Sequence, residues 1–172
     1  MKILLFVSSI YNTLDDGDEE DYQNMINNLE KIKDINEDDK ILVSFCDYTQ
    51  NRNILLFHIR KIIEKIEDKK IYLGEQFLGD LRYKDITSPG ILYEIKFNKI
   101  EQIIDYVRRL QQEDNEVDLI IVDNKMNIEE YEKKLYKEDI NYCKLINNVN
   151  SVNKINEHLE EIIDIKKKEY LN

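Results

Sequence analysis

The chain has 172 residues, of which 25 are Lys or Arg and 36 are Asp or Glu, so its formal net charge is −11. This length and a 42% hydrophobic content fit one domain with a sizeable core and exclude a disordered chain, and the acidity argues against nucleic acid as a partner. No apolar run approaches the roughly 20 residues of a membrane span. We therefore expect a cytoplasmic protein that does not enter a membrane.

The first part of the chain alternates apolar runs with amphipathic segments. Residues 3–7 form a continuous apolar run, which predicts a strand buried on both faces. Apolar residues recur at helical spacing over 22–32 and predict a helix that ends at Asn36. Residues 41–46 then predict a second strand, and 55–66 predict a second helix.

The middle of the chain is less regular. A short third strand is expected at 71–73, whereas 75–94 have no clear period and are expected to form loops or a hairpin. A third helix over 97–110 leads into a further buried strand at 117–122.

The last part repeats the alternation. Residues 128–136 predict a short helix, with Asn127 as its N-cap and Glu130 as the capping-box partner. Residues 142–146 predict the last strand and 152–163 the last helix. This order favours a three-layer α/β/α sandwich with a mostly parallel, Rossmann-like sheet of about five strands, because parallel neighbours need crossover helices.

Polar side chains follow the predicted strands at the edge where open parallel sheets bind ligands. The candidates for facing a ligand or phosphate are Ser8, Ser9, Asn12, Thr13 and Ser44. The candidates for holding a metal are Asp15, Asp16, Asp47 and Asp123. Converging carboxylates suit a hard cation such as Mg²⁺, although helix capping and loop solvation explain the same residues. We name no catalytic residue and no cofactor beyond a possible Mg²⁺.

The sequence contains no motif for a phosphate-binding loop, a zinc site or a cysteine nucleophile. Four glycines in the whole chain cannot form a phosphate-cradling loop, and His58 and His158 have no second ligand at zinc spacing. Cys46 and Cys143 lie in apolar strand-like segments, so we expect buried, reduced thiols. Tyrosines on helix faces are expected to pack in the core or against a partner.

The order of these features resembles the haloacid dehalogenase superfamily of phosphohydrolases. Thr13-Leu14 matches the end of the family's first motif, and Ser44 stands where its second motif has a hydroxyl. Lys61 and Asp123 are the candidates for the third and fourth motifs. The resemblance implies one domain over residues 1–172 without a cap domain.

The departures from the family matter more than the matches. The nucleophilic Asp of the family falls on Ser9, and its acid/base Asp falls on Tyr11. Serine without an activating base does not replace a carboxylate that must form an aspartyl-phosphate and help to hold Mg²⁺. The resemblance therefore implies a degenerate member that does not run the family's reaction.

Three functions follow from these observations. The first is a non-catalytic domain that binds a protein partner or assembles with itself. The second is a Mg²⁺-dependent phosphohydrolase or phosphotransferase with an atypical site. The third is a sensor of a small, nucleotide-type ligand, held by hydroxyl and amide groups at the strand ends.

Overall fold

The computed structural model describes residues 1–8, 18–45, 54–66, 70–74 and 99–171. In this part of the chain, strands and helices alternate as the apolar pattern predicts. The elements are β1 (Lys2–Ser8), α1 (Glu19–Asn36), β2 (Lys40–Phe45), α2 (Ile54–Glu64), β3 (Ile71–Leu73), α3 (Lys99–Gln112), β4 (Glu116–Val122), α4 (Ile128–Lys137), β5 (Tyr142–Ile146) and α5 (Val152–Leu171). The expected loops or hairpin at 75–94 lie outside the described residues.

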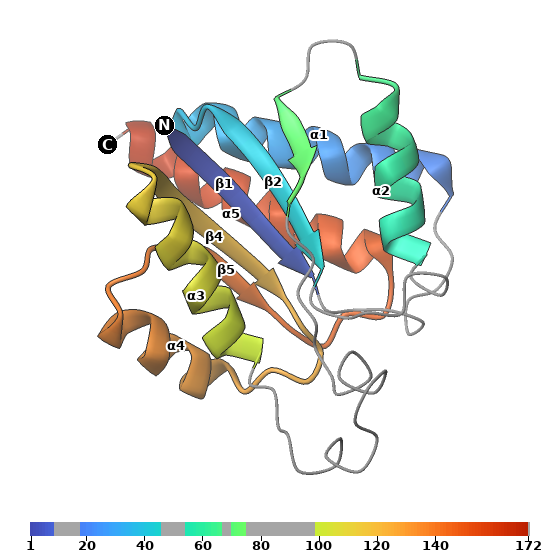
Figure 1. Cartoon of the computed structure of the whole chain (residues 1–172). Coiled ribbons are helices and arrows are strands. Elements are labelled where there is room, and N and C mark those ends of the chain that lie inside the picture. The colour runs from blue at the N-terminus through green and yellow to red at the C-terminus, as the bar shows by residue number, and fades with distance from the viewer. Residues whose placement is uncertain (9–17, 46–53, 67–69, 75–98, 172) are drawn as a thin grey trace, which may run out of the picture.

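The five strands form one sheet in the order β3-β2-β1-β4-β5, and every neighbouring pair is parallel. Helices α1, α2 and α5 cover one face, and α3 and α4 cover the other (Figure 1). The α/β/α sandwich with a Rossmann-like sheet is therefore confirmed, with a sheet that is parallel throughout. The chain builds β1, β2 and β3 outward in one direction and then adds β4 and β5 on the other side of β1. The strand order therefore reverses between the neighbouring strands β1 and β4, and such a switch point is where these folds bind ligands.

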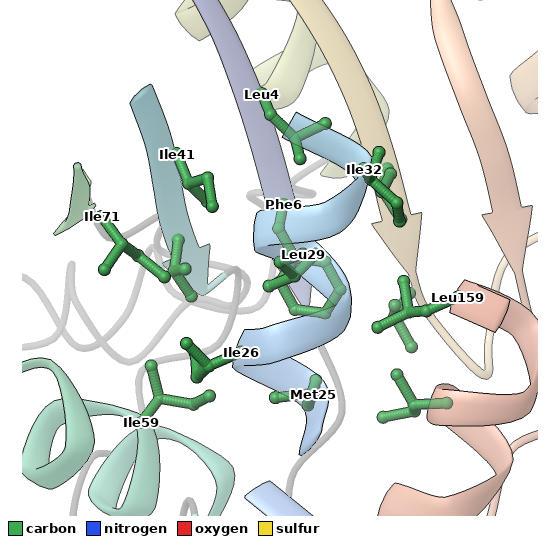
Figure 2. Close-up of a cluster of buried hydrophobic side chains, with 14 of the residues drawn as sticks. Leu4, Phe6, Met25, Ile26, Leu29, Ile32, Ile41, Ile59, Ile71 and Leu159 are labelled. Carbon is green, nitrogen blue, oxygen red and sulfur yellow. The ribbon is translucent and has the colours of Figure 1, made fainter. Parts of the chain in front are cut away.

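Strand β1 is the central strand, and its side chains pack alternately in the two hydrophobic cores on the two faces of the sheet. Leu4 and Phe6 point into the layer under α1, α2 and α5 and belong to the same buried cluster as Leu29 of α1 (Figure 2). Ile3 and Leu5 point into the layer under α3 and α4. Residues on a strand alternate between faces, so a strand that is buried on both faces needs the continuous apolar run seen in the sequence.

Helix α1 shows how the acidic sequence forms helix ends. Asp18 is its N-cap, and a reciprocal pair of bonds with Asp21 completes a capping box. The helix ends at Asn36, as predicted, with Glu37 in the left-handed conformation (φ 60°). Asp114 after α3 and Asp139 after α4 also adopt the left-handed conformation. These acidic residues stand where helices usually place glycine.

Two local expectations need correction. Asn127 caps α4 by accepting from the Glu130 N–H at 3.1 Å, but the Glu130 carboxylate pairs with Lys134 instead of closing a capping box. Helix α5 continues to Leu171, beyond the predicted 163, because Lys166 and its neighbours extend the helix as a charged last stretch. No helix among the described residues is long and apolar enough to cross a membrane.

Edge strand β5 carries an irregularity that the sequence pattern does not show. Its register against β4 shifts between Leu119 and Ile120, which pair with Tyr142 and Lys144. Cys143 is the extra residue, and it packs against the core under α1 and α5. A bulge and a lysine on an edge strand both hinder pairing with a further strand.

Candidate functional site

The carboxyl edge of the sheet brings together three of the predicted site residues. Ser8 ends β1 and lies opposite Phe45 of β2 and Val122 of β4. Ser44 lies next to Phe45, and Asp123 directly follows Val122. Ser8, Ser44 and Asp123 therefore come from three adjacent strands on both sides of the switch point. Ser9, Asn12, Thr13, Asp15, Asp16 and Asp47 lie outside the described residues, as do Tyr11 and Cys46.

Asp123 is 4% exposed, and both of its carboxylate oxygens are used within its own loop and helix. Oδ1 accepts from the Lys125 N–H at 2.9 Å, and Oδ2 accepts from the Tyr131 hydroxyl at 3.3 Å. The bond from the Lys125 N–H closes a turn that Asp commonly forms with the residue two positions further along the chain. The bond from the Tyr131 hydroxyl connects the end of β4 to α4. The carboxylate thus organises the β4–α4 connection.

Asn124 organises the same edge, and sequence reasoning missed its role. Its side-chain amide donates to the Val149 carbonyl at 2.8 Å and accepts from the Val149 N–H at 2.9 Å. This two-point contact fastens the loop after β4 to the loop after β5. Asn can mimic a peptide group in this way, but the sequence gives no signal for a partner 25 positions away.

Ser44 presents a buried hydroxyl on the α3 side of the same edge. The residue is 1% exposed, and its Oγ has no hydrogen-bond partner among the described residues. Gly74 lies against it: a Cβ at Gly74 would be 2.5 Å from Ser44 Oγ and 3.0 Å from the Tyr106 hydroxyl oxygen. Close approach of these groups, and not a positive φ, therefore requires glycine at this position.

We expect Gly74→Ala to lower the free energy of unfolding by about 1–2 kcal/mol, because the added methyl group overlaps the Ser44 hydroxyl. Ser44→Ala removes a buried hydroxyl without a partner and should be neutral or stabilising by about 1 kcal/mol. The Gly74→Ala cost should shrink in the Ser44→Ala background. Urea unfolding of the two single variants and the double variant measures this coupling, and purely additive effects would contradict the predicted contact.

His58 lies against an aromatic ring near the start of α2. Its imidazole stacks on the phenol ring of Tyr22 from α1, with centroids 4.2 Å apart and planes at 15°. Tyr22 is fully buried, so this stack joins the first turns of two helices that both begin at the carboxyl edge. The geometry agrees with the expectation that His58 packs in the structure.

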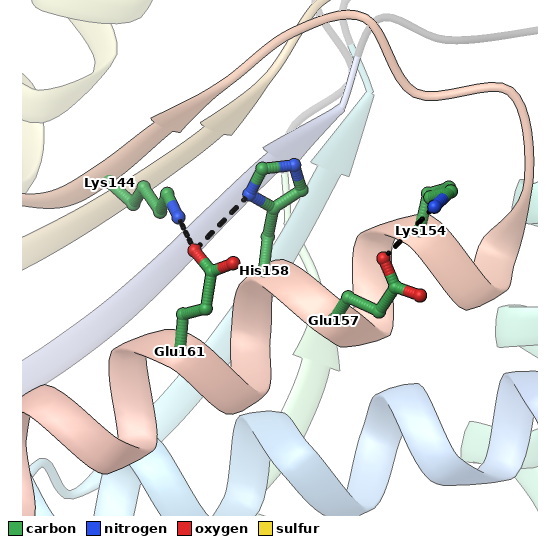
Figure 3. Close-up of polar contacts among 5 residues, drawn as sticks. All are labelled: Lys144, Lys154, Glu157, His158 and Glu161. Carbon is green, nitrogen blue, oxygen red and sulfur yellow. Dashed lines mark hydrogen bonds and ion pairs between the residues drawn. The ribbon is translucent and has the colours of Figure 1, made fainter.

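His158 belongs to a charged cluster on α5 and β5, away from the strand ends (Figure 3). Its Nδ1 lies 3.8 Å from Glu161 Oε2, and Lys144 of β5 binds the same carboxylate. Burial, followed by the nearby Lys144 charge, lowers the pKa of His158 below its usual value. The imidazole is therefore neutral near pH 7, and among the described residues it belongs to no group of three His, Cys, Asp or Glu side chains that could hold a metal ion.

The remaining sequence candidates offer little chemistry. Burial raises the pKa of the Cys143 thiol to about 11, so it carries almost no thiolate at neutral pH, as expected of a structural cysteine. Lys61 is exposed and lies about 10 Å along α2 from the helix start at the carboxyl edge. Among the described residues, no three His, Cys, Asp or Glu side chains are grouped to hold a metal ion.

No family model, curated protein or solved structure matches this chain. Its function therefore has to be argued from the site itself. The described part of the carboxyl edge carries the buried Ser44 hydroxyl and the Asp123 carboxylate, which is bound within its own loop and α4. Such an edge can bind a neutral polar group by hydrogen bonds, whereas phosphoryl transfer requires a nucleophile and a cation.

Proposed function

We propose that this chain is a non-catalytic α/β domain, a degenerate relative of the haloacid dehalogenase superfamily, that acts by binding a protein partner or a second copy of itself. One observation carries the proposal: both oxygens of Asp123 accept hydrogen bonds from within the chain. A Mg²⁺ ion at this position would have to compete with those donors. The identity of Ser9 and Tyr11, where the family's reaction needs Asp, points the same way.

Exposed tyrosines support a binding role. Tyr136 in the last turn of α4 is 88% exposed, and Tyr142 at the start of β5 is partly exposed. Tyrosine is enriched at protein interfaces because a rigid ring buries much area while its hydroxyl keeps a hydrogen bond. A free, partly buried thiol at Cys143 fits the cytoplasm, which we propose as the compartment.

A small-ligand, nucleotide-type sensor is the second candidate, and the Ser44 hydroxyl favours it. Buried polar groups nearly always have partners, so an unpartnered hydroxyl at a ligand-binding edge suggests a partner that comes from outside the chain. Such a ligand would have to move Gly74 or its neighbours to reach Ser44 Oγ, because the atom is buried.

The deciding experiment is a thermal shift with and without millimolar Mg²⁺ or Mn²⁺, run beside a generic phosphatase assay. We expect no metal-dependent shift and no turnover. Asp123→Asn should lower the free energy of unfolding by about 1–2 kcal/mol with or without metal, because an amide nitrogen cannot accept the Tyr131 hydroxyl proton. Asp164→Asn, at an exposed site on α5, is the control for the loss of one charge.

Each contrary result supports a specific alternative. Metal stabilisation that disappears in Asp123→Asn, together with turnover, would replace the proposal with a Mg²⁺-dependent phosphohydrolase or phosphotransferase. Stabilisation by a nucleotide that is lost in Ser44→Ala would favour the sensor. Light scattering separates self-assembly from a monomer, and Tyr136→Ala should weaken any self-association that is found.

A further inference from the structure

The two edges of the sheet differ in how their backbone is protected. Strand β5 forms one edge, and its bulge at Cys143 and its Lys144 side chain both hinder the addition of a further strand. Strand β3 forms the other edge, carries no charged residue between Ile71 and Leu73, and pairs with β2 without a shift in register. In the described part of the chain, β3 is therefore the edge that a further strand can join.

The hydrogen bonds between β2 and β3 fix the direction of the backbone groups of β3. The Lys70 carbonyl accepts from the Ile41 N–H at 2.7 Å, and the Gly74 N–H donates to the Val43 carbonyl at 2.8 Å. The residues on both sides of β3 therefore face β2. Every second residue of a parallel strand bonds to the same neighbour, so the middle residue, Tyr72, faces β2 as well.

The alternate residues of β3 turn their backbone away from the sheet. The N–H and C=O groups of Ile71 and Leu73 point outward, where no described strand pairs with them. The side chains of Tyr72 and Leu73 are 41% and 37% exposed, and they lie on opposite faces because successive residues of a strand alternate. Four outward backbone groups and one exposed side chain on each face are what an extended segment uses to extend a sheet.

The described residues around this edge are basic, although the whole chain has a net charge of −11. Residues 54–66 and 70–74, which contain α2 and β3, carry four cations and one carboxylate, all of them exposed. The cations are Arg60, Lys61, Lys65 and Lys70, and the carboxylate is Glu64. Among the described carboxylates, only Glu19 pairs with one of these cations, at 3.6 Å from Lys65. This side of the molecule therefore favours an acidic partner.

Two lysines stand on one face of the sheet beside β3. Lys40 of β2 places its Nζ 5.9 Å from the centroid of the Tyr72 ring, and Lys70 directly precedes β3. Residues two positions apart on a strand share a face, so Lys70 and Tyr72 lie on the same face. Leu73 lies on the opposite face, the side covered by α2. The edge thus presents positive charge on one face and an apolar side chain on the other.

We propose that the β3 edge is where a protein partner adds an extended acidic segment to the sheet. The proposal rests on the partner-binding function above and names the chemistry of the partner. Asp or Glu of the segment would alternate with apolar residues, so that the carboxylates lie beside Lys40 and Lys70 and the apolar side chains cover Leu73. Its backbone would bond to the outward groups of Ile71 and Leu73.

The test uses the full chain and a synthetic peptide of about seven residues with blocked ends, in which Val alternates with Glu. Amide hydrogen exchange followed by NMR reports on each backbone N–H separately. At a peptide concentration of about ten times the measured Kd, we expect exchange at Ile71 and Leu73 to slow by about tenfold. Exchange at Tyr72, whose N–H already faces β2, should change less. The matched peptide with Lys in place of Glu should slow neither Ile71 nor Leu73.

A charge reversal tests the basic face. Lys70→Glu should weaken binding of the Glu peptide by about threefold to tenfold, because one attraction is replaced by a repulsion. Lys133→Glu is the matched control. It changes the net charge equally at an exposed position on α4, which covers the other half of the sheet, and should leave binding unchanged (Figure 1).

Proline variants test the direction of the backbone groups. Leu73→Pro removes an outward N–H and should abolish peptide binding in a chain that stays folded, because this N–H makes no bond to β2. Tyr72→Pro removes an inward N–H and should lower the Tm by more than Leu73→Pro does. If Leu73→Pro does not fold, the charge reversal and the wild-type exchange pattern still decide.

Equal slowing with both peptides, or no slowing at Ile71 and Leu73, would overturn the proposal. Slowing without peptide that grows with protein concentration would assign the edge to a second copy of this chain instead. The metal and phosphatase assays remain independent of this result. No turnover together with no peptide binding would refute only the docking edge, whereas turnover together with peptide binding would refute only the non-catalytic function.

Discussion

Phe6→Ala is expected to lower the free energy of unfolding by about 3–5 kcal/mol. Phe6 lies on the central strand β1, is fully buried, and belongs to the same buried cluster as Leu29 of α1 (Figure 2). Removal of the ring leaves a cavity in a layer where three helices and the sheet meet, so the surroundings cannot easily collapse into it. Since a domain of this kind is stable by about 5–15 kcal/mol, the loss is a large share of the total.

Urea unfolding followed by circular dichroism measures this loss, with the free energy extrapolated to water. The matched control is Ile165→Ala on α5, because Ile165 is 56% exposed. It should change the stability by less than about 0.5 kcal/mol. If the two variants were equally stable, β1 would not be the centre of the core.

The order of strands and helices could be read from the sequence because parallel strands covered on both faces leave a strong pattern. Residues 3–7 are apolar without interruption and residues 117–122 are apolar except for Asp118, and these two runs form the adjacent strands β1 and β4. The helix periods at 22–32 and 97–110 were equally clear, since each helix buries a single stripe. Boundaries moved by a few residues where caps, such as Asp18 before α1, extend an element beyond its apolar stripe.

The sheet order was not readable, although it decides which site residues meet. Ser44 and Asp123 lie 79 positions apart in the chain, and the placement of β1 between β2 and β4 puts them on strands that flank β1 on its two sides. The alternation of strands and helices predicted a shared edge but was equally compatible with other strand orders. Local patterns carry no information about which strands become neighbours.

The use of each carboxylate was also hidden in the sequence. Asp123 looked like a metal ligand because it ends a strand, yet its oxygens bind Lys125 and Tyr131. Asp38 stands in an acidic run after a helix, yet it is 5% exposed. Charge at a loop position does not distinguish a solvated carboxylate from one that holds the fold together, because the partners come from distant elements.

Asn156→Ala is expected to lower the free energy of unfolding by about 2–3 kcal/mol. Asn156 of α5 accepts from Asn28 Nδ2 of α1 at 3.2 Å and donates to the Asp21 carbonyl at 3.1 Å. Both asparagines are buried in the interface between the two helices. Truncation of Asn156 leaves the buried Asn28 amide and the partly buried Asp21 carbonyl without these partners.

The exposed Asn153→Ala on the same helix is the control and should be nearly neutral. Asn28→Ala combined with Asn156→Ala should cost less than the sum of the two, by about 1 kcal/mol, because both single variants lose one shared bond. Strict additivity in urea unfolding would mean that the two amides do not pair in solution. Asp21 lies in the first turn of α1, at the carboxyl edge, so loss of its bond to Asn156 should also loosen the helix start beside the candidate site.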